Sequence, residues 1–518
     1  MKGFQIQQKG ERRISAALRI MLVVVLLAVQ IGFVVAISYF MQEYLALAYG
    51  VVQVGALFLA VHIYNEPGEL SYKLIWFILL LLAPPVGMIL WFLWGGAAQK
   101  RHLPQNTKRF PDEPESVRIR SEIAVDKLTR QLPAWSRTAN YLCRRDFQLY
   151  QNTSVTYLPE GTILLRNLID RAAKAERFIF LEYFILAEGK LWDELEKILC
   201  AKAREGVEVK IIFDDFGNIK RFSGETIDRL REVGVEVFIF NPVHEYVNRL
   251  HFNYRDHRKI LVIDGKVGFT GGVNLADEYI NHIQKHGRWK DAAVMLEGEA
   301  VRSLTAQFLQ MWGILKEPEY EQFLTRPIPV PENAKGVAAP YGDCPLDGER
   351  VGEMVYIDLL NRARDYIHIM TPYLILDGEL ETALKFAAER GVDVHLILPG
   401  KPDKQFPYAL AKSHYSALLD SGVKISEWSP GFVHAKVFVV DGREAVVGTI
   451  NLDYRSLYHH FEDAVWMVDA PCIRDIEQDF QHTLEQCRAV ENTSASIWQK
   501  HYLLRATGML LKVIAPLL

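Results

Sequence analysis

The pattern of apolar positions divides the chain into an N-terminal part with long uncharged runs and a longer part with short strands and helices. Residues 20–41 contain no charged side chain, and a run of this length crosses a hydrocarbon core of about 30 Å. Two more apolar stretches, 44–64 and 74–94, follow closely. A cleaved signal peptide would carry a shorter apolar region. The pattern therefore predicts a basic N-terminus of the cytoplasmic type at 1–19 and a membrane region at 20–95, with two or three spans.

Basic residues stand on both sides of this membrane region, so the positive-inside rule gives opposing answers if there are three spans. Pro84 and Pro85 interrupt the third apolar stretch. Proline removes backbone donors, which favours a kink or a re-entrant hairpin at that point. The number of spans and the side of the membrane that carries the rest of the chain stay open.

From residue 150 onward the pattern repeats as two β-α-β units. In the first, strand-like residues 178–186 precede an amphipathic helix and a second strand at 207–213; in the second, 366–375 and 392–398 flank the helix. We expect an α/β fold of two tandem units with helices on their sheets, related by a pseudo-two-fold axis. The predicted boundaries are a connector at 96–149, a first unit at 150–324, a Pro- and Gly-rich linker at 325–347, a second unit at 348–490 and an amphipathic C-terminal segment at 491–518. That last segment suits either a membrane surface or packing against the preceding unit.

Composition narrows the possible functions. The net charge is −4, which gives no global basic field of the kind that nucleic-acid binders usually carry. The five cysteines are scattered and form no Cys-x-x-Cys pair, so we expect free thiols and neither a disulfide framework nor a zinc site.

The chemistry lies in a motif that occurs once in each unit. Residues 257–274 read HRKILVIDGKVGFTGGVN and residues 434–451 read HAKVFVVDGREAVVGTIN, with every matched position 177 residues apart. On a strand, residues two apart point to the same face, so each copy presents an imidazole and an ammonium group together. The matched residues are His257, Lys259, Asp264 and Asn274 in the first copy, and His434, Lys436, Asp441 and Asn451 in the second.

Two such copies brought side by side would form a single site for a phosphodiester. One imidazole can attack phosphorus while the other protonates the leaving alkoxide. The two ammonium groups can hold the non-bridging oxygens, and the two asparagines can add neutral donors. The Asp-Gly pairs at 264–265 and 441–442 also predict hairpin turns, and the two interpretations are compatible.

Both motifs match the HxK-x4-D-x6-G-[GST]-x-N signature, and residues 150–485 resemble the phospholipase D superfamily, with the greatest likeness to bacterial cardiolipin synthases. The flanking sequences NYRDHRKILVIDG (253–265) and GTINLDYRSLYHHFE (448–462) carry that likeness, and so does the apolar region at 65–95. The resemblance implies a phosphohistidine mechanism without metal or cofactor, and a multi-pass protein of the bacterial cell membrane. Its implied substrates are two phosphatidylglycerol molecules, with cardiolipin and glycerol as products.

The resemblance also implies roles for single residues. His257 would be the nucleophile and His434 the acid–base, although their order is open, and both lysines would bind phosphate. Asp264 and Asp441 would be structural or electrostatic. Asp291 and Glu462 resemble acids that orient the imidazoles, and they follow the motif histidines of their own copies by 34 and 28 residues.

Three alternatives remain on sequence grounds. A hydrolytic phospholipase D would share the motifs and release phosphatidic acid. A nuclease would share the histidine chemistry, but the membrane region and the charge balance count against it. A scaffold with a dead site is disfavoured by two intact motifs. Asp214 and Asp215 are interpreted as caps, and two histidine pairs, 459–460 and 282 with 286, as solvated or packing residues. The oligomeric state stays open.

Overall fold

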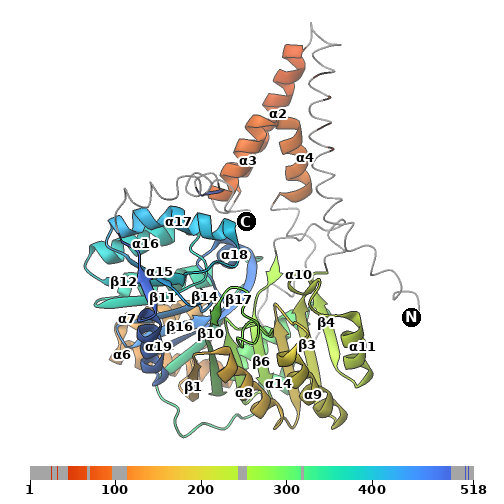
Figure 1. The fold of residues 1–518 in the computed structure, drawn as a ribbon, viewed down its shortest axis with the longest axis vertical. Coiled ribbons are helices and arrows are strands. Elements are labelled where there is room, and N and C mark those ends of the chain that lie inside the picture. The colour runs from red at the N-terminus through yellow and green to blue at the C-terminus, as the bar shows by residue number, and fades with distance from the viewer. Residues whose placement is uncertain are drawn as a thin grey trace. The chain divides into compact units, whose positions relative to one another are not determined.

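The computed structural model describes residues 45–66, 70–95, 114–242, 254–316 and 320–491, with a few single positions nearer the ends. The chain divides into two compact units (Figure 1). Each has its own buried apolar side chains. The smaller unit comprises Met1–Leu103, Asn241–Asn253 and Pro516–Leu518, and the larger comprises Pro104–Phe240 and Tyr254–Ala515.

The smaller unit contains three apolar helices, α2 (Leu45–Asn65), α3 (Leu70–Leu82) and α4 (Pro84–Trp94). Within α2, Leu47–Asn65 is long and apolar enough to cross a membrane, and only 17% of it is buried. The predicted stretch 74–94 is two short helices, because Pro84 begins a new one, and the rings of Trp76 and Trp91 lie 5.0 Å apart. Apart from four positions, the predicted span 20–41 lies outside the described residues. Within the described ranges one helix has the length of a membrane span, which does not support the multi-pass prediction.

The larger unit is built on two sheets with the same strand order. The first sheet runs β1-β9-β7-β6-β2-β3-β4, and the second begins β10-β17-β16-β15-β11-β12-β13 and adds β18. Strands β2, β3 and β4 of the first sheet are parallel to one another, and so are β11, β12 and β13 of the second. The other neighbouring strands in each sheet are antiparallel. The prediction of two tandem α/β units is confirmed. The strands are β1 (Thr153–Leu158), β2 (Phe178–Tyr183), β3 (Glu208–Asp214), β4 (Glu236–Phe240), β6 (Lys259–Ile263), β7 (Val267–Gly271), β9 (Ala293–Gly298), β10 (Val337–Asp343), β11 (Tyr366–Met370), β12 (Asp393–Pro399), β13 (Lys424–Trp428), β15 (Val437–Val440), β16 (Glu444–Gly448), β17 (His460–Val468) and β18 (Cys487–Ala489).

Helices pack on each sheet through their apolar faces and form one core per copy. Figure 1 shows the first copy in yellow and green and the second in cyan and blue. The helices are α6 (Glu115–Gln131), α7 (Pro133–Cys143), α8 (Gly161–Ala172), α9 (Lys190–Arg204), α10 (Asp215–Asn218), α11 (Gly224–Glu232), α13 (Val301–Trp312), α14 (Tyr320–Leu324), α15 (Val351–Arg362), α16 (Gly378–Glu389), α17 (Gln405–Asp420), α18 (Tyr454–Tyr458) and α19 (Cys472–Leu484). Every residue of α13 is buried, since the helix contacts both its own sheet and β10 of the other copy.

Three predicted boundary segments have more structure than their composition indicated. The second half of the predicted linker at 325–347 forms β10, the first strand of the second sheet, so the linker is shorter than predicted. Within the predicted connector at 96–149, α6 and α7 contribute to the core of the second copy. Near the C-terminus, Leu511 packs against a small cluster around Leu410 and Tyr454. All five cysteines are free, as expected.

Candidate active site

Two short strand pairings join the copies where the motifs begin. β5 (Arg255–Asp256), directly before His257, runs parallel to the start of β17, and β14 (Gly431–Val433), directly before His434, runs parallel to β8 (Arg288–Lys290). The backbone N–H of His257 donates to the carbonyl of Phe461 at 2.9 Å, and that of His434 to the carbonyl of Lys290 at 2.7 Å. Each motif histidine therefore stands beside a strand of the other copy.

This crossing pairs each imidazole with a carboxylate from the opposite copy. Nδ1 of His257 lies 2.9 Å from each carboxylate oxygen of Glu462. Nδ1 of His434 lies 2.7 Å from Oδ2 of Asp291. A carboxylate at Nδ1 holds the proton of a neutral imidazole there, which leaves the lone pair of Nε2 free to attack or to take a proton. Neither acid contacts the motif histidine that precedes it in the sequence.

The two acids occupy equivalent places although their spacers differ. Gly271 pairs with Ala293 across β7 and β9, and Gly448 pairs with Ala464 across β16 and β17. Asp291 and Glu462 each lie two residues before those alanines. The register therefore matches Asp291 to Glu462, and the longer spacer of the first copy lies between β7 and β8.

Both lysines lie close to their motif histidines. Nζ of Lys259 donates to the carbonyl oxygen of His257. Nζ of Lys436 lies 2.9 Å from Nδ1 and 3.1 Å from Nε2 of His434. Burial lowers the pKa of Lys259 to about 8 and that of Lys436 to about 7. Burying two ammonium groups side by side is costly, and a bound anion would offset that cost.

The ammonium groups of Lys259 and Lys436 lower the pKa values of both motif imidazoles. Burial, followed by Lys259 and Lys436, holds the pKa of His257 well below its ordinary value. Burial and Lys436 lower the pKa of His434 to about 4, although Asp291 opposes the shift. Both rings are thus neutral near pH 7. An anionic diester between the lysines would raise both pKa values and make one ring a usable acid.

The two motif aspartates take no part in this cluster. Oδ1 and Oδ2 of Asp264 accept from the backbone N–H groups of 176–178, and those of Asp441 from 364–366. Their φ angles are 55° and 50°, the left-handed conformation that the Asp-Gly hairpin turns require. Both side chains therefore tie a hairpin to the start of the neighbouring strand.

The residue after the motif's first glycine differs between the copies and contacts the acid in each. A Cβ added to Gly272 would lie 2.1 Å from Oδ1 of Asp291, so only glycine leaves room for this carboxylate. At the matching position, the hydroxyl of Thr449 donates to Oε2 of Glu462. The shorter side chain of Asp291 thus lies against Gly272, and the longer side chain of Glu462 is held by a hydrogen bond from Thr449.

The two motif asparagines are not equivalent. Asn274 accepts from the N–H of Ile185 at 3.1 Å and donates to the hydroxyl of Tyr279 at 2.7 Å. These bonds hold the turn after β7 and engage part of the amide that was predicted to face phosphate. Asn451 is 4% exposed, and its Oδ1 has no hydrogen-bond partner among the described residues.

His460 was predicted to be solvated or to fill a packing role, yet it lies beside the reacting cluster. It is buried, its ring centroid lies 5.4 Å from that of His257, and its Nδ1 lies 3.4 Å from Oε1 of Glu462. Burial lowers its pKa to about 3, so the ring is neutral. Trp289 takes the corresponding place beside His434, with ring centroids 5.5 Å apart. His460 and Trp289 are brought to the motif histidines only by strand pairing between the copies, so the sequence did not indicate either contact.

Three side chains at this site, those of His257, His460 and Glu462, are of the types that bind metal ions. Ligand atoms of His257, His460 and Glu462 lie within 4.8 Å of one another. The ammonium group of Lys259 is close enough to lower the pKa of His257, and it would repel a cation in that place. The residues therefore fit an anion better than a metal ion.

A buried charge cluster behind Lys259 distinguishes the two copies. Nε of Arg258 lies 3.0 Å from Oε1 of Glu182 and 3.7 Å from Oδ1 of Asp256. At the positions that match Arg258 and Asp256, the second copy has Ala435 and Val433. The two imidazoles therefore have different surroundings. A division of labour between nucleophile and acid requires such a difference.

The interpretation of Asp214 as a cap is confirmed. Its side chain accepts from the N–H of Phe216 at 2.8 Å and so caps α10. It also accepts from the guanidinium of Arg255 at 3.2 Å. The carboxylate therefore anchors the strand that leads into His257.

Comparison with known families agrees with this architecture. The model of the family described as cardiolipin synthase, PLD-like domain, matches residues 165–312 and 356–484. The chain belongs to the phospholipase D superfamily. A second family model, described as phospholipase D-nuclease N-terminal, matches residues 54–96.

Several relatives of this phospholipase D-type chain share most of its length. A cardiolipin synthase of Geobacillus kaustophilus is 33% identical over 89% of this chain and 92% of its own. Cardiolipin synthase 2 of Bacillus anthracis is 34% identical over 84% of each chain. An uncharacterised protein of Streptococcus mutans is 54% identical over 73% of this chain and 82% of its own.

Among solved structures, phosphatidylserine synthase of Haemophilus influenzae superposes with a TM-score of 0.54 at 14% identity, covering 72% of this chain and 94% of that one. The superposition shows the shared fold. The chain is thus an enzyme of the phospholipase D superfamily that resembles cardiolipin synthases, and its relatives imply phospholipid substrates.

Proposed function

We propose that the protein is a cardiolipin synthase, which transfers the phosphatidyl group of one phosphatidylglycerol to a second and releases glycerol. The observation that carries this proposal is the crossed pair of acid–imidazole contacts. With these contacts, the two imidazoles and the two ammonium groups would act together on a single phosphodiester. The membrane-length helix α2 would keep such an enzyme at the bilayer that holds its substrates.

In the first step, Nε2 of His257 attacks phosphorus and the bond from phosphorus to the glycerol oxygen breaks. The negative charge of the diester raises the pKa of His434, so that its ring also carries a proton on Nε2. His434 gives this proton to the leaving oxygen, glycerol leaves as a neutral alcohol, and the ring of His434 becomes neutral. Lys259 and Lys436 offset the charge of the non-bridging oxygens as the transition state forms. Glu462 stabilises the positive charge that develops on His257 once its ring nitrogen has bonded to phosphorus.

In the second step, neutral His434 takes the proton of a glycerol hydroxyl on the second phosphatidylglycerol. The freed oxygen attacks phosphorus, and the bond between phosphorus and Nε2 of His257 breaks. The products are cardiolipin and the regenerated enzyme. The ammonium groups supply the charge stabilisation that metal ions supply in other phosphoryl-transfer sites, so this mechanism uses no metal ion.

Purified protein with phosphatidylglycerol vesicles tests the proposal. Cardiolipin and free glycerol in equal amounts are the expected products, and His257→Ala and His434→Ala should abolish both. Phosphatidic acid as the sole lipid product would establish the hydrolytic alternative. Turnover that survives both substitutions would overturn the assignment of the site.

A further inference from the structure

The two motif histidines have neighbours of opposite character at equivalent positions of the strand pairs that join the copies. Phe432 lies opposite Trp289 in the pair of β14 with β8, and Arg255 lies opposite His460 in the pair of β5 with β17. Phe432 and Arg255 each stand two residues before their motif histidine, and the register that matches the two acids also matches Trp289 to His460. The second motif histidine therefore has an aromatic pair where the first has a polar pair.

Three aromatic rings surround the imidazole of His434. The ring centroids of Tyr279, Trp289 and Phe432 lie 5.4, 5.5 and 5.9 Å from that of His434. Trp289 lies 4.8 Å from each of the other two rings, so the three form a continuous wall. Tyr279 and Phe432 are buried, and the hydroxyl of Tyr279 already accepts a hydrogen bond from an amide. Because ring faces give water no ordinary hydrogen bond, this wall disfavours an ordered water beside the imidazole.

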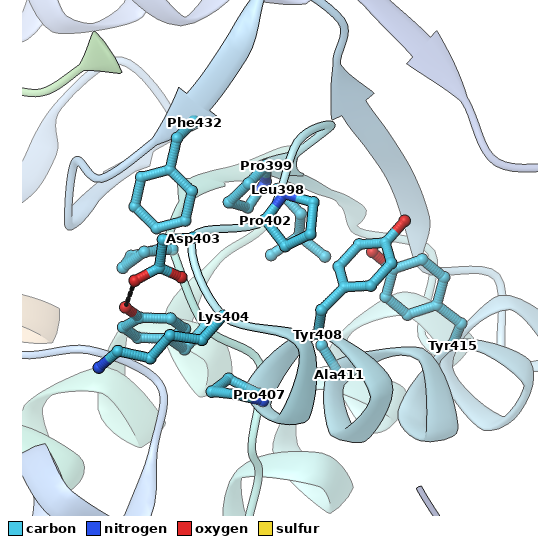
Figure 2. A pocket seen from close by; sticks show the side chains of 12 residues that line it. Leu398, Pro399, Pro402, Asp403, Lys404, Pro407, Tyr408, Ala411, Tyr415 and Phe432 are labelled. Carbon is cyan, nitrogen blue, oxygen red and sulfur yellow. Dashed lines mark hydrogen bonds between the residues drawn. The ribbon is translucent and has the colours of Figure 1, made fainter. Parts of the chain in front are cut away.

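Phe432 also lines a small hollow at the carboxyl end of β12 (Figure 2). The hollow has about 20 Å³ of space, enough for one water molecule. Asp403, which accepts a hydrogen bond from the hydroxyl of Tyr373 at 2.8 Å, and Lys404 offer polar partners for a water there. The ring of Phe432 lies 6.2 Å from that of Tyr373. Phe432 is therefore a wall that the hollow shares with the imidazole of His434.

The position of water matters because the phosphohistidine can be resolved in two ways. In transfer, a lipid hydroxyl oxygen bonds to phosphorus, the bond from phosphorus to Nε2 of His257 breaks, and His434 takes the hydroxyl proton. In hydrolysis, a water molecule takes the place of the lipid hydroxyl, and the product is phosphatidic acid. Water is far more abundant than lipid hydroxyl groups, so transfer requires that water be kept from the base.

We propose that Trp289 and Phe432 are specificity-determining residues, whose rings keep water from a place where His434 can deprotonate it. The phosphohistidine is then resolved by a lipid hydroxyl. This inference rests on the proposed function, since it names what favours transfer over hydrolysis in that reaction. The polar pair beside His257 needs no such property, because that imidazole is bonded to phosphorus while water and lipid compete.

The initial rates of cardiolipin and phosphatidic acid formation from phosphatidylglycerol vesicles test the inference. Their ratio reports the second step alone, because both products come from one intermediate. Phe432→Ser and Trp289→Ser should each lower the ratio of cardiolipin to phosphatidic acid about tenfold, the low end of the discrimination that one apolar contact gives. Phe432→Leu keeps an apolar wall and should keep the ratio near that of wild type. If Phe432→Ser does not fold, Trp289→Ser decides the outcome.

Phe222→Ser is the matched control, since it also removes a buried ring, 4.8 Å from Trp192 in the core of the first copy and outside the site. It should leave the product ratio unchanged. The inference is wrong, while the proposed function stands, if both wall variants to serine give the wild-type ratio. It is also wrong if Phe222→Ser or Phe432→Leu lowers the ratio as much as they do. If wild-type protein forms only phosphatidic acid, the proposed function itself fails.

Discussion

Replacing Glu462 by glutamine tests the crossed acid–imidazole pairing. The buried carboxylate lies 2.9 Å from Nδ1 of His257. An amide in its place can donate to Nδ1, and the imidazole proton then moves to Nε2, the atom that has to attack phosphorus. The ring of His257 becomes positive only as it bonds to phosphorus, and losing the buried carboxylate beside that charge costs about 3–5 kcal/mol. This corresponds to roughly 10²–10⁴-fold slower phosphohistidine formation.

A nitrophenyl phosphodiester isolates this step, because nitrophenolate leaves without a proton from His434. Wild-type protein and Asp291→Asn should each release a burst of about one equivalent of nitrophenol, and Glu462→Gln should show no burst on that timescale. Glu477→Gln is the matched control. It removes a carboxylate 3.0 Å from Nδ1 of His368, outside the site, and should keep the burst. Mass spectrometry of the quenched wild-type protein should locate the phosphoryl adduct on His257.

The opposite pattern refutes the reasoning. If the adduct forms on His257 while Asp291→Asn loses the burst and Glu462→Gln keeps it, each acid serves the histidine of its own copy. An adduct on His434 would instead exchange the two histidine roles and leave the crossed pairing in place.

Three further outcomes are expected. Gly272→Ala should lower kcat by about tenfold or more, because the added Cβ overpacks against Asp291. Gly224→Ala adds its Cβ to open space and should leave kcat unchanged. Equal steady-state rates for the two variants would contradict the close approach of Gly272 to Asp291. Asp264→Asn weakens the acceptors for three backbone N–H groups, which should lower the free energy of unfolding by about 1.5–3 kcal/mol and with it the melting temperature. The kcat of the folded protein should persist. An unchanged melting curve would argue against a structural role for Asp264. The pKa values of Lys259 and Lys436 are lowered to about 8 and about 7, so both lysines lose positive charge as the pH rises through that range. Inorganic phosphate should therefore bind more weakly at about pH 9 than at about pH 6.5. Calorimetry that finds equal affinity at the two pH values would contradict the pKa shifts.

Features that depend on short stretches of sequence were predictable. The central strands of both copies follow from runs of β-branched residues, and the hairpins at Asp264 and Asp441 follow from their Asp-Gly pairs. The repeat itself indicated two units, because one strand pattern recurs with identical motif spacing. Pro84 likewise predicted the interruption that separates α3 from α4.

Features that depend on pairing between distant strands were not predictable. The spacing of Asp291 and Glu462 from the motifs gives no sign that each acid reaches the other copy, since two-residue strands such as β5 are too short to leave a pattern. His460 was interpreted as a solvated or packing residue, and its place beside His257 follows only from the pairing of its strand with Arg255. The strand β10 was hidden in a segment whose Pro and Gly content is typical of linkers.

The crossed strand pairs also bear on how the enzyme matures. A nascent chain that ends before β14 has His257 but lacks Glu462, and it has Asp291 but lacks His434. In the proposed mechanism such a half-made product has no activity towards lipids, because His257 and Asp291 each lack a partner. Under the proposed function, activity would therefore appear only when the second copy packs against the first, after both copies have been synthesised.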